Sequence, residues 1–332
     1  MLARIRVLLS FDLVVPVSDN FAPVEYAIEG YVVRARKPEC SSIPADSRAI
    51  KSASVNKRPA IRADVIVIDF LKTGFERKEN SAWDPPLPII QQAVNSLLGR
   101  IRSVVRAPQI HPVVFPGTNV SLQYLNDDES ELEKQDGFVR GRAITSVPFS
   151  FVSLHDEVWH DVQRLPPQYE PPPWEPFLLD ASAALDFNHT GQAIVLAATA
   201  LEIFISHTLD KLAEKQGMSP DLWFWINERR REPSLVEQFD QLLKCFTGHS
   251  LKEEKNLWQL FSELRKARNS FVHTGTIVVD GKIVNQTMAV ALVASASGIM
   301  NKVRVWLPLE LHWSEFGHEI QLEIEKGVGF QF

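Results

Sequence analysis

Three side chains near the end of one predicted helix have the types and the spacing of an RNA-cleaving set: Arg268, Asn269 and His273. The arginine guanidinium carries a permanent planar charge that holds a phosphate through paired hydrogen bonds. Histidine is the one side chain whose unperturbed pKa lets it move protons near neutral pH. Together these groups support phosphoryl transfer without a metal ion or another cofactor. In that chemistry Arg268 stabilises charge on the phosphoryl oxygens and Asn269 orients His273 or the phosphate.

The helix that carries these residues has a start signal and a stop signal in the sequence. Ser250 and Glu253 match the capping box, in which the two side chains satisfy each other's backbone amides, so this box is predicted to open the helix. Gly275 is predicted to end it, because glycine favours the left-handed conformation that follows a last helical turn. An apolar stripe along the segment predicts that the helix is docked: Leu257, Leu260, Phe261, Leu264 and Phe271.

Helical geometry restricts how these side chains can act together. At about 100° and 1.5 Å per residue, Arg268 and His273 lie about 140° apart around the helix axis and roughly 7.5 Å apart along it. Asn269 and His273, by contrast, are neighbours at positions i and i+4. One straight helix therefore does not point Arg268 and His273 at one phosphate. Either the helix unwinds near His273, or a second subunit completes the site.

The length of the chain, 332 residues, exceeds the size at which a single hydrophobic core usually stops growing, so two domains are expected. Residues 1–165 are predicted to form a β-rich α+β domain, because strand-like runs alternate with Pro, Ser and Lys clusters. One amphipathic helix, Pro88–Val105, is expected to pack on the sheet. The expected strands of the sheet are Met1–Val15, Tyr31–Ala35, Val65–Phe70, Val120–Leu125 and Phe138–Val147.

A Pro-rich segment, residues 166–176, separates two differently patterned halves and is predicted to be a semi-rigid linker. A ligand for a partner module is the functional alternative. Residues 177–307 are nearly all helical in pattern, and residues 308–332 are predicted to be a C-terminal tail. The expected fold class is thus a two-domain α+β chain that ends in an all-α, up-and-down helical bundle. The elements expected there are the helices Phe177–Phe187, Gln192–Glu214, one after Ser219, one after Ser234 and Thr287–Trp306, with a hairpin at Thr276–Asn285.

The composition is that of an ordinary soluble globular protein, with 45% hydrophobic and 23% charged residues. A formal net charge of -6 argues against a general nucleic-acid coat, but an RNA enzyme needs only local arginines or lysines. The distant Cys40 and Cys245 argue against a disulfide framework or a cysteine-rich zinc site and favour a reduced cytoplasm. Asp12 and Pro16 break the apolar opening, and no run reaches the roughly 20 apolar residues of a membrane span, so no membrane association is expected.

Residues 263–273, with the sequence Glu-Leu-Arg-Lys-Ala-Arg-Asn-Ser-Phe-Val-His, resemble the signature of HEPN domains. Ribonuclease members of that family carry an arginine, usually a polar residue next, and a histidine after four to six positions; the spacing here is four. Residues 193–204 look like the long early helix of the family, with small residues followed by Ala-Leu-Glu. The resemblance covers residues 174–307 and implies an up-and-down α bundle, typically dimeric.

The active members of the family are metal-independent endoribonucleases in which the arginine and histidine of both subunits line a shared cleft. The resemblance therefore implies RNA as substrate, a homodimer through the helical domain, and products with a 2′,3′-cyclic phosphate and a free 5′-hydroxyl. It also implies a prokaryotic defence or toxin-antitoxin setting with an antitoxin or defence partner. The resemblance does not extend to residues 1–165, for which a sensor or specificity role is the hypothesis. The rival interpretation is a non-catalytic HEPN-type module that binds a nucleotide or a protein partner.

A structural interpretation of the motif stands beside the catalytic one. Arg268 at a helix end stabilises the negative end of the dipole, Asn269 satisfies nearby backbone, and His273 caps the last carbonyls. Glu202, in an otherwise apolar helix segment, should find a cation, and Arg265 or Arg268 is the expected partner. Such a pair either supports the structure or orients Arg268.

Arg100, Arg102 and Arg106 line the end of the predicted N-terminal helix, and Arg102 and Arg106 share a face. They can hold RNA phosphates, although a solvated helix face near the negative end of the dipole also accounts for them.

Other candidates carry weaker signals. His155 and His160 have the wrong spacing for a helical zinc site, which needs ligands at i and i+4, so no metal is expected there. Trp223 and Trp225 can stack bases, and at least one of them is expected in the core. Arg229–Arg231 are expected at the solvated end of that helix, with phosphate contact as the alternative.

Overall fold

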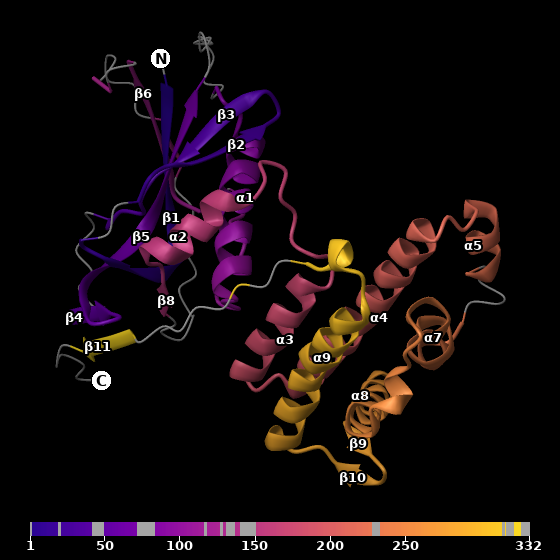
Figure 1. Ribbon diagram of the computed structural model, residues 1–332. Coiled ribbons are helices and arrows are strands. Elements are labelled where there is room, and N and C mark those ends of the chain that lie inside the picture. The colour runs from indigo at the N-terminus through magenta and orange to yellow at the C-terminus, as the bar shows by residue number, and fades with distance from the viewer. Residues whose placement is uncertain are drawn as a thin grey trace. The chain divides into compact units, whose positions relative to one another are not determined.

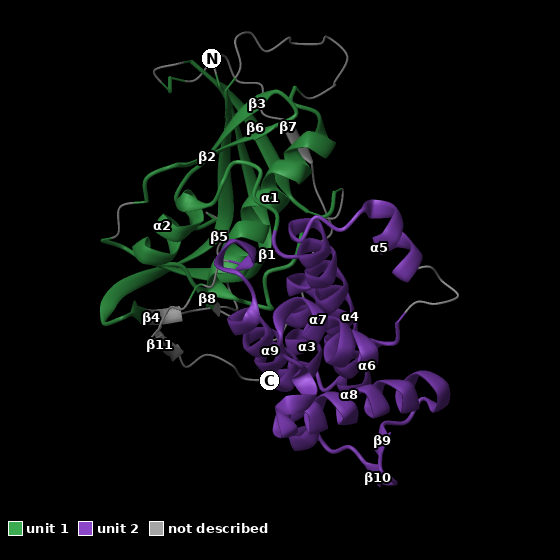
Figure 2. Ribbon diagram, turned by 45° about the vertical axis from the view of Figure 1, so that its right-hand side comes forward, with its two compact units in different colours: residues 1–170, 315–332 green, residues 171–314 purple. Residues whose placement is uncertain are grey.

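The computed structural model describes residues 2–18, 21–41, 50–71, 84–115, 118–126, 129–130, 137–139, 151–227, 233–313, 316 and 322–326. The chain divides into two compact units, which Figure 2 colours green and purple. The sheet unit comprises Met1–Glu170 and Glu315–Phe332, and the helical unit comprises Pro171–Ser314. An α+β chain with a mainly antiparallel sheet in its N-terminal part and helices in its C-terminal part is therefore confirmed.

The sheet unit contains nine strands in the described part of the chain, and β1 lies at the centre of the sheet (Figure 1). β1 pairs antiparallel with β5 and β6 and parallel with β8. The strands are β1 Leu2–Pro16, β2 Val24–Ile28, β3 Tyr31–Ala35, β4 Ile50–Val55, β5 Arg58–Leu71, β6 Val120–Leu125, β7 Gly137–Val139, β8 Phe151–Ser153 and β11 Leu322–Lys326. The strands predicted in the first 125 residues are confirmed; most of the run predicted to 147 lies outside the described residues.

Two helices, α1 Leu87–Val105 and α2 Asp156–Arg164, share one hydrophobic core with the sheet. The side chains of β1 alternate, so that Ile5 and Val7 enter this core while Arg4 and Arg6 lie on the opposite face. Ile90, Val94 and Leu97 recur at helical spacing along α1 and are buried, which confirms the amphipathic helix packed on the sheet. The Tyr26 hydroxyl also donates to the Ala93 carbonyl at 2.8 Å, which fixes α1 against β2.

The last strand of the sheet comes from the far end of the chain. β11 pairs antiparallel with β4 over five residues, from Leu322 opposite Val55 to Lys326 opposite Ile50. The helical unit is therefore inserted between α2 and β11 of the sheet unit. Residues 308–332 were predicted to be only a tail, but Leu322–Lys326 form a strand of the sheet. The prediction missed this strand because its partner lies more than 250 residues away along the chain.

Deleting residues 315–332 is expected to lower the free energy of unfolding of the sheet unit by about 1–3 kcal/mol, because cross-strand pairs contribute roughly 0.2–1 kcal/mol each. Thermal unfolding of the truncated and full chains measures this loss. Deletion of residues 327–332 alone, which follow β11, is the control and should leave the unfolding temperature unchanged. Equal unfolding temperatures for all three chains would contradict the pairing of β11 with β4.

The helical unit consists of helices and one small hairpin in the part of it that is described. Its elements are α3 Glu175–Asp186, α4 Thr190–Lys215, α5 Pro220–Ile226, α6 Leu235–Glu237, a π-helical turn Gln238–Leu242, α7 Leu243–Thr247, a 3-10 turn Leu251–Glu253, α8 Lys255–Thr274, β9 Val278–Val279, β10 Lys282–Ile283, α9 Gln286–Trp306 and a 3-10 turn Leu309–Leu311. The predicted N-caps Ser219 and Ser234 accept hydrogen bonds from the first turns of α5 and α6. The helices and the hairpin predicted for this half are therefore confirmed.

Two of these helices, α4 and α9, are long and apolar enough to cross a membrane by length and composition. Of their most apolar windows, 56% and 44% respectively are buried inside the protein. Phe204 of α4 and Ile299 of α9 are fully buried in one hydrophobic core of the helical unit. Both helices thus have the burial expected of core helices of a folded domain.

Arg100 holds the start of the Pro-rich segment to α1. Its side chain is buried, with Nη1 donating to the Leu165 carbonyl at 3.3 Å and Nη2 donating to the carbonyls of Pro166 and Pro167 at 2.8 and 2.7 Å. Desolvation by burial lowers the pKa of the Arg100 guanidinium. The solvated helix face predicted for Arg100 was therefore wrong. The residues that bury it follow more than 60 positions later, so local spacing could not reveal them.

Candidate functional site

The predicted catalytic residues lie on α8, whose start has no side-chain cap and whose end is capped by Gly275. The capping box between Ser250 and Glu253 is present, but it closes a 3-10 turn, and α8 begins at Lys255 without a side-chain cap. The prediction that this box opens α8 was wrong, because i to i+3 hydrogen bonds from the amides of Glu253 and Glu254 tighten the turn. Gly275 ends the helix as predicted, with φ 71° and its amide donating to the Phe271 carbonyl at 2.8 Å.

The apolar side of α8 packs into the core of the helical unit. Phe261, Leu264 and Ala267 are buried, and Leu257 and Leu260 pack partly buried against the same core. This confirms that the helix is docked and leaves its opposite side in water. The site residues Arg268, Asn269 and His273 are therefore carried on a helix whose position is fixed by burial.

Arg268 is held by two neighbouring side chains. Its Nη1 donates to Asn269 Oδ1 at 3.2 Å, and its Nη2 lies 4.0 Å from Glu202 Oε1 on α4. Both Arg268 and Glu202 are more than a third exposed, so this ion pair contributes little energy and leaves the guanidinium available to an anion. The Nε of Arg268 is buried and has no hydrogen-bond partner within the described residues.

The predicted cation partner of Glu202 is Arg268 rather than Arg265. The Arg265 guanidinium instead lies over the Phe261 ring, 5.9 Å from its centroid, and no ion pair joins it to Glu202 in the described part of the chain. Arg265 thus covers the aromatic core on its own helix. Glu202 is therefore placed to orient Arg268, which was one of the two roles predicted for this pair; the other was support of the structure.

His273 is exposed on the last turn of α8, and the helix continues through Thr274. Unwinding near His273, the first way predicted to bring it to Arg268, is therefore wrong. The two side chains keep the separation of about 140° that a regular helix imposes. Completion of the site by a second subunit is the remaining alternative.

The end of α8 is satisfied by groups other than His273. The Thr274 hydroxyl donates to the Ser270 carbonyl at 2.8 Å, the Ser270 hydroxyl donates to the Thr276 carbonyl at 2.8 Å, and Gly275 caps Phe271. Over the described residues, no hydrogen bond or ion pair joins His273 to another side chain or to these carbonyls. The interpretation of His273 as a helix cap is not supported by these contacts.

The C-terminal end of α8 also contacts the start of α4. An ideal Cβ built on Gly191 would lie 2.2 Å from Phe271 Cε2 and 2.3 Å from Cζ, so the backbone of α4 lies directly against this ring. Phe271 is two residues from His273. The glycine therefore sets how closely the two helices approach at the end that carries the imidazole.

Replacing Gly191 by alanine is expected to destabilise the protein by about 1–3 kcal/mol, because the Phe271 ring must leave its position. Chemical denaturation measures the change. Gly99→Ala in α1 is the matched control, since nothing lies within 4 Å of its added Cβ and alanine favours the helix interior. Adding Phe271→Leu should recover part of the stability lost in Gly191→Ala. Equal stability of the Gly191 and Gly99 variants would contradict the close approach.

Several exposed apolar side chains lie at the end of the helical unit where α8 finishes. Val272 is 53% exposed and Val290 on α9 is 47% exposed, while Phe187, after α3, is 42% exposed. The turn after α3 is joined to the start of α9 by hydrogen bonds from Gln286 to Leu185 and from Thr190 to Gln286. Large contiguous apolar patches are typical of surfaces that bind another protein chain, whereas single exposed apolar side chains are common on any protein surface.

Four other candidates belong to the sheet unit, whereas α8 belongs to the helical unit. Arg102 and Arg106 belong to α1 of the sheet unit; Arg106 is exposed and caps α1 in the left-handed conformation, and Arg102 is partly buried. His155 is fully buried at the start of α2, whereas His160 is exposed.

The aromatic pair of α5 separates as its spacing predicts. Trp223 packs against Phe246 with ring centroids 5.7 Å apart and donates from Nε1 to Asp210 at 2.7 Å, while Trp225 is 52% exposed. Trp223 is thus the member of the pair that joins the core. Arg229–Arg231 lie outside the described residues.

Comparisons of the chain with protein-family models, with curated proteins and with solved structures find no match. The geometry of α8 and its neighbours is therefore the basis for the functional proposal.

Proposed function

We propose that the helical unit is a HEPN-like bundle and that the protein is a metal-independent endoribonuclease acting as a homodimer. The observation that carries the proposal is the arrangement of Arg268 and His273 on α8. Arg268 is oriented by Asn269 and Glu202 and keeps a buried Nε without a partner in the described residues. His273 is exposed five residues later, and the helix end is capped without it.

The proposed reaction is a transfer of the phosphoryl group within RNA. The ribose 2′-oxygen attacks the adjacent phosphorus and the bond from phosphorus to the 5′-oxygen breaks, which leaves a 2′,3′-cyclic phosphate and a 5′-hydroxyl. His273 accepts the 2′-hydroxyl proton or donates a proton to the leaving 5′-oxygen. Arg268 stabilises the charge that develops on the phosphoryl oxygens, with Asn269 orienting the guanidinium that it contacts.

The geometry of one helix supports the proposed dimerisation. Because α8 remains helical through Thr274, Arg268 of one subunit and His273 of the same subunit face different directions. A two-fold axis near the end of α8 would bring Arg268 of one subunit toward His273 of its partner, and the reverse. The exposed Val272, Val290 and Phe187 supply apolar surface for such an interface.

Cleavage of total RNA by the purified full-length protein in the presence of EDTA tests the proposal. The wild-type protein should cut, and His273→Ala and Arg268→Ala should not; mass measurement of the fragments should find 2′,3′-cyclic phosphate ends. If the wild type and both variants cut equally, or if none cuts, the enzyme proposal fails. Growth arrest on overexpression of the wild type, absent for His273→Ala, is the corresponding result expected in cells.

The rival proposal is a non-catalytic module that binds a nucleotide or a protein through the same surface. It is favoured by the ion pair of Arg268 with Glu202, which neutralises part of the charge that catalysis requires. In that case Arg268→Ala should weaken nucleotide or partner binding, while no RNA is cut under any condition.

We also place the protein in a reduced prokaryotic cytoplasm, with RNA as substrate and an antitoxin or defence protein as the partner that restrains it. Cys40 and Cys245 are both free and exposed, which is compatible with a reducing compartment. In this proposal the sheet unit acts as the sensor or specificity domain.

A further inference from the structure

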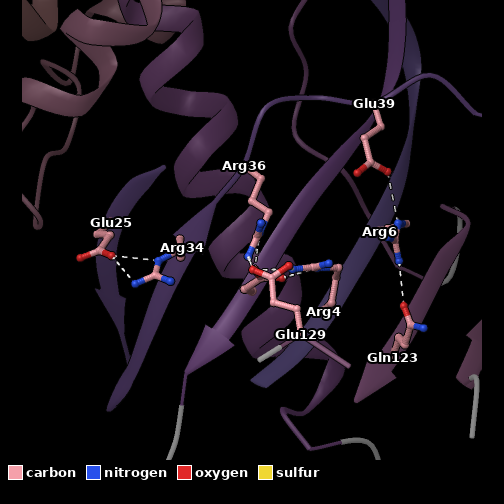
Figure 3. Close-up of polar contacts among 9 residues, drawn as sticks. Arg4, Arg6, Glu25, Arg34, Arg36, Glu39, Gln123 and Glu129 are labelled. Carbon is pink, nitrogen blue, oxygen red and sulfur yellow. Dashed lines mark hydrogen bonds and ion pairs between the residues drawn. The ribbon is translucent and has the colours of Figure 1, made fainter. Parts of the chain in front are cut away.

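The face of the sheet opposite α1 carries a row of charged side chains. The strand registers place Arg34 on β3, Asp69 on β5, Arg4 on β1 and Gln123 on β6 directly opposite one another. Arg36, which follows β3, continues beside β5 through a hydrogen bond from its amide to the Val67 carbonyl at 2.9 Å. Figure 3 shows the side chains of Arg4 and Arg36 converging at the centre of this face.

Asp69 fixes the two guanidiniums at the centre. Its carboxylate is completely buried and accepts from Arg4 Nε at 2.7 Å, from Arg4 Nη2 at 3.1 Å and from Arg36 Nε. Hydrogen bonds of this kind, with both partners charged, are the strong ones in proteins. Asp69 is therefore a permanent part of the sheet, and it holds Arg4 and Arg36 in one orientation.

Glu129 binds the other side of the same two guanidiniums. Its Oε2 accepts from Arg4 Nη2 at 3.0 Å and its Oε1 accepts from Arg36 Nη2, so one carboxylate bridges both arginines. These hydrogen bonds, first that from Arg36 and then that from Arg4, lower the pKa of Glu129. Unlike Asp69, the Glu129 side chain is 45% exposed. The exposed partner can therefore leave while the buried partner stays.

The backbone of Glu129 is unusual for the residue type. Glu129 has φ 65°, in the left-handed region that a non-glycine residue rarely adopts, within a turn closed by the Asn126 amide and the Ser130 carbonyl at 2.9 Å. This left-handed conformation costs conformational energy, and the carboxylate of the same residue contacts the two arginines.

We propose that Arg4 and Arg36 form a phosphate-binding site in the sheet unit, and that the Glu129 carboxylate occupies the phosphate position until a ligand displaces it. Each guanidinium donates one N–H to a different oxygen of the same anion, and charged hydrogen bonds of this kind also hold the oxygens of a phosphate. A phosphate presents the same pair of oxygens as the carboxylate and, as a monoester, carries more negative charge. The ligand is a nucleotide or an RNA strand that presents this group.

The other exposed glutamates on this face distinguish the central pair from general surface charge. Glu25 pairs with Arg34 alone at 2.8 Å, and Glu39 pairs with Arg6 alone at 3.3 Å among the ion pairs found for the described residues (Figure 3). Of the three exposed glutamates described on this face, Glu129 alone bridges two arginines. The site goes beyond the proposed ribonuclease function and does not depend on it.

Glu129→Gln in the full-length chain tests the site directly. Isothermal titration uses uridine monophosphate as the probe and uridine as the unphosphorylated control. Phosphate-dependent binding should be about 2- to 30-fold tighter in the variant than in the wild type. The reason is that two exposed ion pairs, worth roughly 0.2–1 kcal/mol each, no longer compete with the ligand. Glu25→Gln removes the same charge from a single-arginine pair and should change the affinity by less than about two-fold.

Arg36 is expected to be required for this effect. Arg36→Lys in the Glu129→Gln chain keeps the charge but removes the guanidinium fork, so the tighter binding should disappear. Thermal unfolding of both chains shows that the sheet unit is still folded. Binding of a short RNA without a 5′-phosphate is then measured in the Glu129→Gln chain that also carries His273→Ala. Binding of this RNA would identify a phosphodiester as the group recognised, and binding of uridine monophosphate alone would identify a terminal phosphate. Absence of binding in Glu129→Gln, an equal effect of Glu25→Gln, or tight binding that survives Arg36→Lys would each overturn the proposal.

Discussion

Replacing His273 or Arg268 by alanine is expected to lower the rate of RNA cleavage by about 10²- to 10⁴-fold, the range typical of a general acid-base group or an electrostatic stabiliser of a transition state. The effect should appear in kcat more than in KM, since both groups act on charge and protons that develop during the reaction. His273 is exposed, and Arg268 is partly exposed and is not among the buried residues of α8, so neither substitution removes a buried apolar side chain.

Matched controls separate catalysis from a change in the helix. Lys266→Ala removes a positive charge from the same helix, where Lys266 pairs with Asp280 at 2.6 Å, and His249→Ala removes an exposed imidazole that stacks on Trp306. Both control variants should cut RNA within a few-fold of the wild type. Circular dichroism should show the same helical content in all four variants. If the control variants lose as much activity as Arg268→Ala and His273→Ala, the losses come from a change in overall charge or in folding and not from catalysis.

Replacing Trp174 by alanine is expected to destabilise the helical unit by about 3–5 kcal/mol, the range for removal of a buried aromatic side chain. Trp174 is buried just before α3, and its ring makes edge contacts with Phe204 of α4 at 5.1 Å and with Trp313 at 5.4 Å between centroids. It therefore joins the first and last segments of the helical unit to its core. Truncation leaves a cavity between two aromatic rings that are held by other elements.

Urea denaturation measures the loss of stability in Trp174→Ala, and tryptophan fluorescence reports the change around Trp313. Phe224→Ala is the control, because Phe224 is 74% exposed in the same unit and should change the free energy of unfolding by no more than about 0.5 kcal/mol. A Trp174 variant as stable as the Phe224 variant would show that the first and last segments are not held together by this aromatic cluster.

The elements of the fold that could be predicted are those with local signals. α1, α4, α8 and α9 have apolar residues at helical spacing, and Ser219, Ser234 and Gly275 mark helix ends by chemistry that acts within one turn. A cation near Glu202 was also predictable, but the sequence left Arg265 and Arg268 open as partners, and the structure has Arg268.

The features that could not be predicted depend on residues far apart in the chain. β11 is a strand because β4 is there to pair with it, and Arg100 is buried because three carbonyls more than 60 positions later cover it. The cluster around Asp69 was missed for the same reason: Arg4, Arg36 and Glu129 come from distant segments, and none of them has a local motif.

The most direct test of the central claim mixes two inactive proteins. Arg268→Ala and His273→Ala chains, unfolded together and refolded at equal amounts, form mixed dimers in which one subunit supplies Arg268 and its partner supplies His273. If each site combines residues of two subunits, the mixture should recover about a quarter of the wild-type activity, since half of the dimers are mixed and each has one intact site. Recovery of no activity, with mixed dimers present and both single variants inactive, would contradict a site shared between subunits.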